Sequence, residues 1–208
     1  MSIRKLALLV ATAALGLLAV GFASASATTL NGDPGNTPLA TGNVTITNTS
    51  SGTSTLTTSL GNLSCTNTRF EATINNNHAA TLTGSLNQLT FTSCTDTIPF
   101  LTITSCHQHG ATPGVRITAT TTGGSVNLTD VGVRCIFSSG GACYFTAATA
   151  NGVANNSAST ISYTNVQAAG ITGTADNLGS LCPSSGTFST VLNHIVEVGT
   201  NRTVTIVR

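Results

Sequence analysis

Apolar and polar residues alternate along most of the chain with a period of two. The alternation is strict in Val-Thr-Ile-Thr at residues 44–47 and in Phe-Glu-Ala-Thr-Ile at residues 70–74. This period places successive side chains on opposite faces of a strand, so that one face packs in a core and the other meets water. Other segments of this kind lie at residues 86–91, 100–103, 115–119, 126–131, 161–163 and 204–207.

Residues that favour tight turns separate these segments. Gly123-Gly124, Gly140-Gly141 and Asn151-Gly152 are examples, because Gly and Asn adopt backbone conformations that other residues avoid. The pattern predicts about ten short strands and an all-β fold, an antiparallel β-sandwich linked by disulfides. We expect a single domain over residues 43–208, preceded at residues 28–42 by an extended, turn-rich leader.

The N-terminal segment has the pattern of a secretory signal peptide. Arg4 and Lys5 precede an uncharged apolar run at residues 6–22, and Ala25-Ser26-Ala27 supplies the small residues of a cleavage site. The alternative is a transmembrane anchor, since the run is at the short limit for spanning a bilayer. The small residues favour cleavage after Ala27, so residues 1–27 are predicted to be removed and the protein to be secreted.

Composition narrows the classes of partner. The chain has 208 residues, of which 40 are Thr, 21 Ser and 18 Asn, and its net charge is +1. Thr and Asn are poor helix formers, which disfavours a helical fold. Seven Lys and Arg residues do not provide the basic surface that nucleic-acid binding needs. After cleavage no Lys remains, so we expect no membrane association of the mature chain.

All six cysteines follow the predicted signal peptide. An even number in an exported protein implies disulfide bonds, and six cysteines allow 15 connectivities. A structural metal site is the competing interpretation, but the CxxC spacing typical of such sites is missing. Two of the cysteines flank a Ser-Ser-Gly-Gly turn, two others each close an alternating segment, and two remain. The predicted bonds are therefore Cys135–Cys143, Cys65–Cys94 and Cys106–Cys182.

After the predicted signal peptide the sequence contains no GxSxG, HExxH or SxxK motif, so we predict no catalytic residues and no cofactor. One local cluster, Cys-His-Gln-His at residues 106–109, is a candidate metal site because His107 and His109 would share a face of a strand. His78, His194 or Asp96 could complete such a site if the fold brought them close. The simpler interpretation is that both histidines lie on the surface at a strand end.

Two segments of the chain resemble a group of uncharacterised small secreted proteins of actinobacteria. A Cys-Thr strand, Leu-Ser-Cys-Thr-Asn-Thr-Arg-Phe at residues 63–70, precedes a Leu-x-Phe-x-x-Cys-Thr strand at residues 86–95. Cys-Tyr-Phe at residues 143–145 and Leu-Cys-Pro at residues 181–183 are similar to the C-terminal half of that group. The resemblance covers residues 63–198 and implies a secreted β-sandwich without catalytic residues. The Cys-His-Gln-His segment departs from it.

Three functions remain open from the sequence. The first is a non-catalytic extracellular or cell-surface protein with a structural, adhesive or partner-binding role. The second is a module that binds a carbohydrate or a cell-wall polymer through Asn, Thr and the two Tyr residues. The third is a hydrolase or metal-dependent enzyme built on His107 and His109.

Overall fold

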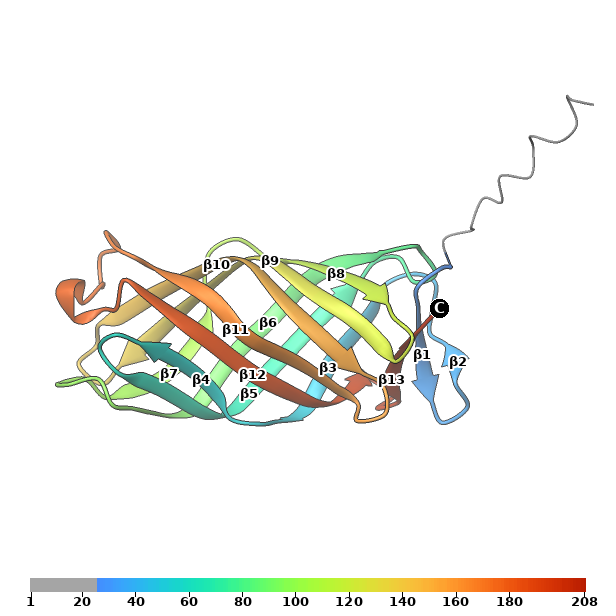
Figure 1. Cartoon of the computed structure of the whole chain (residues 1–208), viewed down its shortest axis with the longest axis horizontal. Coiled ribbons are helices and arrows are strands. Elements are labelled where there is room, and N and C mark those ends of the chain that lie inside the picture. Colours follow the sequence, from blue (N-terminus) through green and yellow to red (C-terminus); the bar gives the residue numbers. More distant parts are fainter. Residues whose placement is uncertain (1–25) are drawn as a thin grey trace, which may run out of the picture.

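The computed structural model describes residues 26–208, so residues 1–25 of the predicted signal peptide lie outside the described part. The described chain is all-β, with one short 3-10 turn, η2 (Gly179–Leu181), before the last long strand (Figure 1). The strands are β1 (Thr29–Asp33), β2 (Thr37–Pro38), β3 (Val44–Ser51), β4 (Ser54–Thr58), β5 (Asn62–Ile74), β6 (Leu82–Asp96), β7 (Ile103–Gln108), β8 (Gly114–Ala119), β9 (Gly123–Phe137), β10 (Ala142–Asn155), β11 (Thr160–Ile171), β12 (Ser185–Glu197) and β13 (Thr203–Val207).

These strands form one antiparallel sheet that closes on itself. The order runs β11-β10-β9-β7-β6-β5-β3-β12, and β11 also pairs with β12. Strand β8 shares with β7 the place between β6 and β9, and β4 shares with β3 the place between β5 and β12. The all-β antiparallel fold predicted from the pattern is confirmed, and its two facing layers are opposite sides of one continuous sheet.

Alternation within each strand separates the interior of the closed sheet from its surface. In β5, Phe70, Ala72 and Ile74 are fully buried, whereas Glu71 and Thr73 between them are partly exposed. Thr73 uses its hydroxyl on the outer face, 3.0 Å from that of Thr45 on β3. The period-two pattern therefore fills the interior with apolar side chains and covers the outside with short polar ones.

One end of the closed sheet is covered by β1, β2 and β13, which lie together at the right in Figure 1. Leu30 and Leu39 are 0% and 2% exposed there, packed into the same core as Ile206. We predicted that residues 28–42 form a leader outside the domain. They are instead part of the domain and close one end of it. The turn residues between 33 and 37 form a tight hairpin that returns the chain over this end.

The bond between Cys65 on β5 and Cys94 on β6 is confirmed. The two residues are direct partners in the register of these strands, so their side chains point to the same face of the sheet. This bond links the two strands near the end of the sheet opposite β1.

The other two predicted bonds, Cys135–Cys143 and Cys106–Cys182, are wrong. Cys135 does lie opposite Cys143 across the β9–β10 hairpin, but β7 places Cys106 opposite Cys135 in the same row. The observed bonds join Cys106 to Cys135 and Cys143 to Cys182. Cys182 reaches β10 because the connection at residues 172–184 folds back over the end of the sheet, with a Cα–Cα distance of 5.4 Å to Cys143.

The segment at residues 100–103, predicted as a strand, is mostly a loop, and only Ile103 belongs to β7. Phe100 is 97% exposed and has a positive φ of 67°. The carboxylate of Asp96 accepts hydrogen bonds from the backbone N–H groups of Ile98 and Ile103, at 3.2 and 2.5 Å. These bonds satisfy backbone groups locally, in place of a strand ladder.

The end formed by β1 depends on the buried side chain of Asn77. Its Oδ1 accepts a hydrogen bond from Leu30 N at 2.7 Å, and its Nδ2 donates to the carbonyls of Leu30 and Leu39, both at 3.1 Å. Asn77→Ala would leave Leu30 N and Leu39 O without these partners, while Leu30 O keeps the hydrogen bond from Leu39 N at 2.9 Å. We expect it to lower the free energy of unfolding by about 3 kcal/mol, measured by urea titration.

The matched control for this substitution is Asn87→Ala. Asn87 is exposed and donates only to the hydroxyl of Thr73, at 2.8 Å. We expect a change within about 0.5 kcal/mol. Equal losses in the two variants would contradict the role given to Asn77.

Candidate functional site

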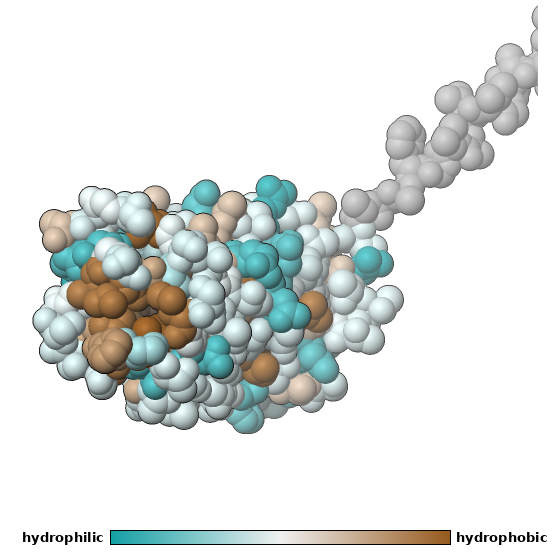
Figure 2. Space-filling model, turned by 60° about the vertical axis from the view of Figure 1, so that its left-hand side comes forward, coloured by the Kyte–Doolittle hydropathy of each residue, from teal (hydrophilic) through white to brown (hydrophobic). Residues whose placement is uncertain are grey.

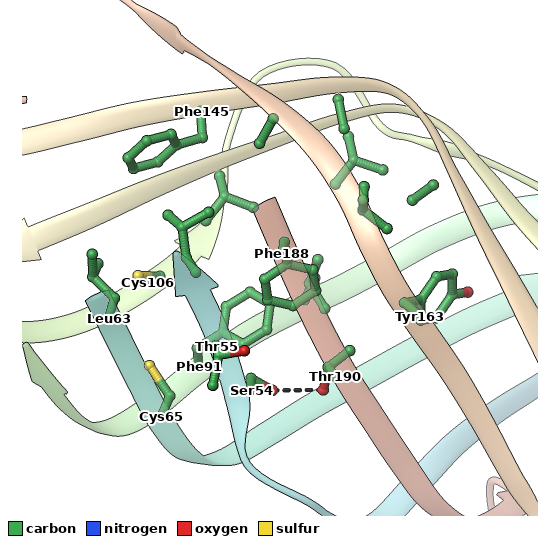
Figure 3. Close-up of a pocket in the computed structure, with 18 of the residues that line it drawn as sticks. Ser54, Thr55, Leu63, Cys65, Phe91, Cys106, Phe145, Tyr163, Phe188 and Thr190 are labelled. Atoms are coloured by element: carbon green, nitrogen blue, oxygen red, sulfur yellow. Dashed lines mark hydrogen bonds between the residues drawn. The ribbon is translucent and has the colours of Figure 1, made fainter. Parts of the chain in front are cut away.

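An apolar cavity of about 90 Å³ lies inside the closed sheet (Figure 3). Side chains from β4 to β7 and from β9 to β12 contribute to its wall, and no described residue that lines it is charged. Apolar members include Leu63, Cys65, Phe91, Cys106, Phe145 and Phe188. A second, smaller space of about 20 Å³ lies toward the end covered by β1 and β13.

The cavity opens at the end of the sheet opposite β1. Figure 2 shows apolar side chains gathered around a hollow at this end. Backbone hydrogen bonds hold the loops here: Ser138 N–H donates to Thr102 O of a neighbouring loop at 2.8 Å, and Ala142 N–H, at the start of β10, donates to Asp176 O at 2.9 Å. The loops at this end are residues 59–61, 97–102, 138–141 and 172–184.

Exposed apolar side chains are present on the loops at this end. The loops carry Leu60, Phe100 and Leu181, which are 41%, 97% and 42% exposed. These are three of the six large apolar side chains that are exposed in residues 26–208. Half of the exposed large apolar side chains of the described residues are therefore on loops at the end where the cavity opens.

Small residues on β10 and β11 leave the space that the cavity occupies. Ala147, Ala150 and Ala168 line it, where larger side chains would fill the interior. The rings of Phe91 on β6 and Phe188 on β12 also line the cavity and meet edge to face, with centroids 5.3 Å apart. The small alanine side chains do not fill the space beside these paired rings and the disulfides in the wall, and a cavity remains.

Tyr163 forms the inner part of the wall, and Figure 3 shows its hydroxyl directed away from Phe91 and Phe188. Its ring lies over Gly152, where a Cβ atom would come within 2.6 Å of it. Asn151-Gly152, predicted as a turn, is therefore part of β10, because Gly makes room for the buried ring. Burial raises the pKa of the Tyr163 hydroxyl, so this group stays neutral.

Three hydroxyl groups form a hydrogen-bonded group beside the cavity, whose lining also includes Thr55, Thr146 and Tyr163. Ser54 Oγ lies 2.6 Å from Thr190 Oγ1 and 2.5 Å from Thr68 Oγ1. Ser54 and Thr190 line the cavity, and all three side chains are buried. These three residues could not be identified from the sequence, because the chain has many other Ser and Thr residues. They differ from most of the others in being buried on the inner face of the sheet.

A polar cluster on the outer face holds the connection at residues 172–184 beside the opening. The guanidinium of Arg134 donates to the carboxylate of Asp176, and the hydroxyl of Tyr144 donates to the same carboxylate. The ring of His109 packs edge to face against Tyr144, with centroids 4.8 Å apart. Together with the Cys143–Cys182 bond, this cluster fixes the loop to β9 and β10.

The candidate metal residues are not brought together. His107 accepts or donates a hydrogen bond with Ser105, Nε2 to Oγ at 2.8 Å, while His109 packs on Tyr144. Asp96 binds backbone groups of the 97–102 loop, and His78 lies 3.0 Å from the Thr29 hydroxyl near the closed end. Within residues 26–208, no three His, Cys, Asp or Glu side chains are placed to hold a metal ion.

No protein-family model, curated protein or solved structure matches the chain. Among the described residues, no helix has the length and apolar character needed to cross a membrane.

The cluster on the outer face predicts a pH dependence of stability. Hydrogen bonds from Tyr144 and then from Arg134 lower the pKa of the Asp176 carboxyl from its ordinary value of 3.8. The carboxylate therefore stabilises the fold above pH 3.8, and this contribution is lost as the pH falls through the lowered pKa. We expect Asp176→Asn to melt at a lower temperature than the unsubstituted protein at pH 7, with the difference closing at acid pH.

Asp130→Asn is the control for this pH series. Asp130 is exposed and has no ion-pair partner among residues 26–208. Thermal melts by circular dichroism should show no pH-dependent difference for this variant. A gap for Asp176→Asn that stays constant down to the lowest pH would contradict the assignment.

Proposed function

We propose that this protein is a secreted, non-catalytic binding protein that holds a small apolar ligand, or the apolar end of a larger one, inside its closed sheet. The observation that carries the proposal is the uncharged cavity, closed at one end by β1 and β13 and open at the other end within an apolar rim. Concave apolar sites of this kind are the usual form of small-molecule binding sites.

The size of the cavity restricts the ligand. At about 90 Å³ it is smaller than the roughly 300–1,000 Å³ of sites that enclose drug-sized molecules. A short alkyl chain or a chain end would fit, and the rest of a longer molecule would lie against Leu60, Phe100 and Leu181. Each methylene moved from water into the cavity would contribute about 0.8 kcal/mol.

The alternatives drawn from the sequence receive less support from the geometry. A carbohydrate platform built on the two tyrosines needs their ring faces exposed, but Tyr163 is inside the sheet and Tyr144 packs against His109. An enzyme built on His107 and His109 would have its chemistry on the outer face, separate from the cavity. Neither histidine lines the cavity.

Secretion remains part of the proposal. Three disulfide bonds suit an oxidising compartment outside the cytosol. The signal-peptide pattern of residues 1–27 and the resemblance to secreted actinobacterial proteins support the same location.

Binding is tested with a series of straight-chain 1-alkanols from butanol to decanol, by calorimetry or by shifts of methyl signals in nuclear magnetic resonance spectra. We expect affinity to rise about fourfold for each added methylene until the chain fills the cavity, and then to level off. Ala147→Leu would fill the cavity and lower the affinity at least tenfold, corresponding to about 1.4 kcal/mol.

Ala148→Leu is the matched control, because Ala148 is exposed on the outer face of the same strand while Ala147 lines the cavity. It should bind the alkanols as the unsubstituted protein does. The proposal would be wrong if no alkanol bound, or if both leucine variants bound them equally well.

Export is tested by intact-mass spectrometry of the protein secreted by its host, with and without reduction. We expect a chain that begins at Thr28 and lacks six hydrogens, since all six cysteines are paired. Retention of residues 1–27 would contradict cleavage, and free thiols would contradict the disulfide assignment.

A further inference from the structure

The hydroxyl groups of Ser54, Thr68 and Thr190 together have three O–H donors but make only two hydrogen bonds with one another. Ser54 Oγ is the centre of the group, with Thr68 Oγ1 at 2.5 Å and Thr190 Oγ1 at 2.6 Å (Figure 3 marks the second contact). The three side chains are 2%, 1% and 4% exposed, so bulk water does not supply partners. These two contacts are the only hydrogen bonds that the three hydroxyl oxygens make within residues 26–208.

The count of protons follows from the chemistry of hydroxyl groups. Each hydroxyl donates one proton, so the group has three donors. Two contacts use two of them, whichever way each is directed, and one O–H is left without an acceptor. A buried donor without a partner costs roughly 1–3 kcal/mol, which favours any ligand that supplies an acceptor.

The place of the group determines which part of a ligand would meet it. Ser54 and Thr190 line the cavity, whereas Thr68 lies behind them. In Figure 3 they lie near Phe91 and Phe188, between Leu63 on one side and Tyr163 on the other. A ligand atom that accepts a hydrogen bond from Ser54 or Thr190 would therefore lie in the cavity with apolar parts of the ligand on both sides of it.

We propose that the ligand carries a neutral hydrogen-bond acceptor, a carbonyl or ether oxygen, within its apolar part, and that this oxygen accepts the spare proton of the Ser54–Thr68–Thr190 group. The inference rests on the proposed function, since it requires a ligand in the cavity. A carboxylate is disfavoured because no Lys, Arg or His among the described residues lines the cavity to offset its burial. The ligand class is thus a ketone, ester or ether with alkyl arms.

The test compares 2-heptanone with heptane in the unsubstituted protein and in the triple variant Ser54→Ala, Thr68→Val, Thr190→Val. The substitutions remove all three hydroxyls together, so that none is left unpaired. We expect the ketone to lose about fivefold more affinity than the alkane, the effect of one hydrogen bond between neutral groups. Comparing the two ligands within each protein cancels their different solubilities in water.

Thr45→Val is the matched control. It removes a hydroxyl from a similar pair, Thr45 and Thr73, on the outer face of β3 and β5. The relative affinities of ketone and alkane should stay unchanged in this variant.

A second measurement needs no folded triple variant. The infrared carbonyl stretch of ¹³C-labelled 2-heptanone bound to the unsubstituted protein should lie below its value in heptane solution, as for a hydrogen-bonded carbonyl. Alkane binding without this shift, or an equal loss of both ligands in the triple variant, would overturn the inference and leave the proposed function standing. If neither ligand binds, both proposals are wrong.

Discussion

The pairing of β11 with β12 is the constraint on which the rest of the structure depends. It joins the two ends of an antiparallel sheet, so that strands far apart in the chain enclose one interior. Closure satisfies backbone groups that would be free at the edges, which matters in a chain with few charged residues to protect such edges. Closure also means that the inward-facing side chains pack against one another and not against a second sheet or a layer of helices. The interior can then be filled or left partly empty by the choice of side chain alone.

The cavity that we propose as a binding site follows from the choice of side chains. Alanines on β10 and β11 and the paired rings of Phe91 and Phe188 line one space inside the sheet, and this space is the cavity. The two ends of the sheet differ because β1 and β13 cover one of them, while the loops at the other carry exposed apolar residues. One of these loops, residues 172–184, is fixed by the Cys143–Cys182 bond and by the cluster around Asp176. Contacts that stabilise the fold therefore lie at the same end of the molecule as the opening of the cavity.

Much of the fold could be predicted from alternation, because segments such as residues 70–74 carry a period that only a strand satisfies. Cys65–Cys94 could also be predicted, since both cysteines close alternating segments. The bond of Cys135 could not, because two cysteines lie opposite it and only the place of β7 decides between them. Asn151-Gly152 has the composition of a turn, yet Tyr163 on the neighbouring strand requires glycine there. The cavity could not be predicted from the sequence, because its alanines, Ser54 and Thr190 come together only when the sheet closes.

The most direct test of the central claim is a crystal structure of the mature protein pressurised with xenon, which enters dry apolar cavities. The account predicts a xenon atom inside the closed sheet, between the alanines of β10 and the pair Phe91 and Phe188. An interior packed without space, with no xenon between these side chains, would contradict it.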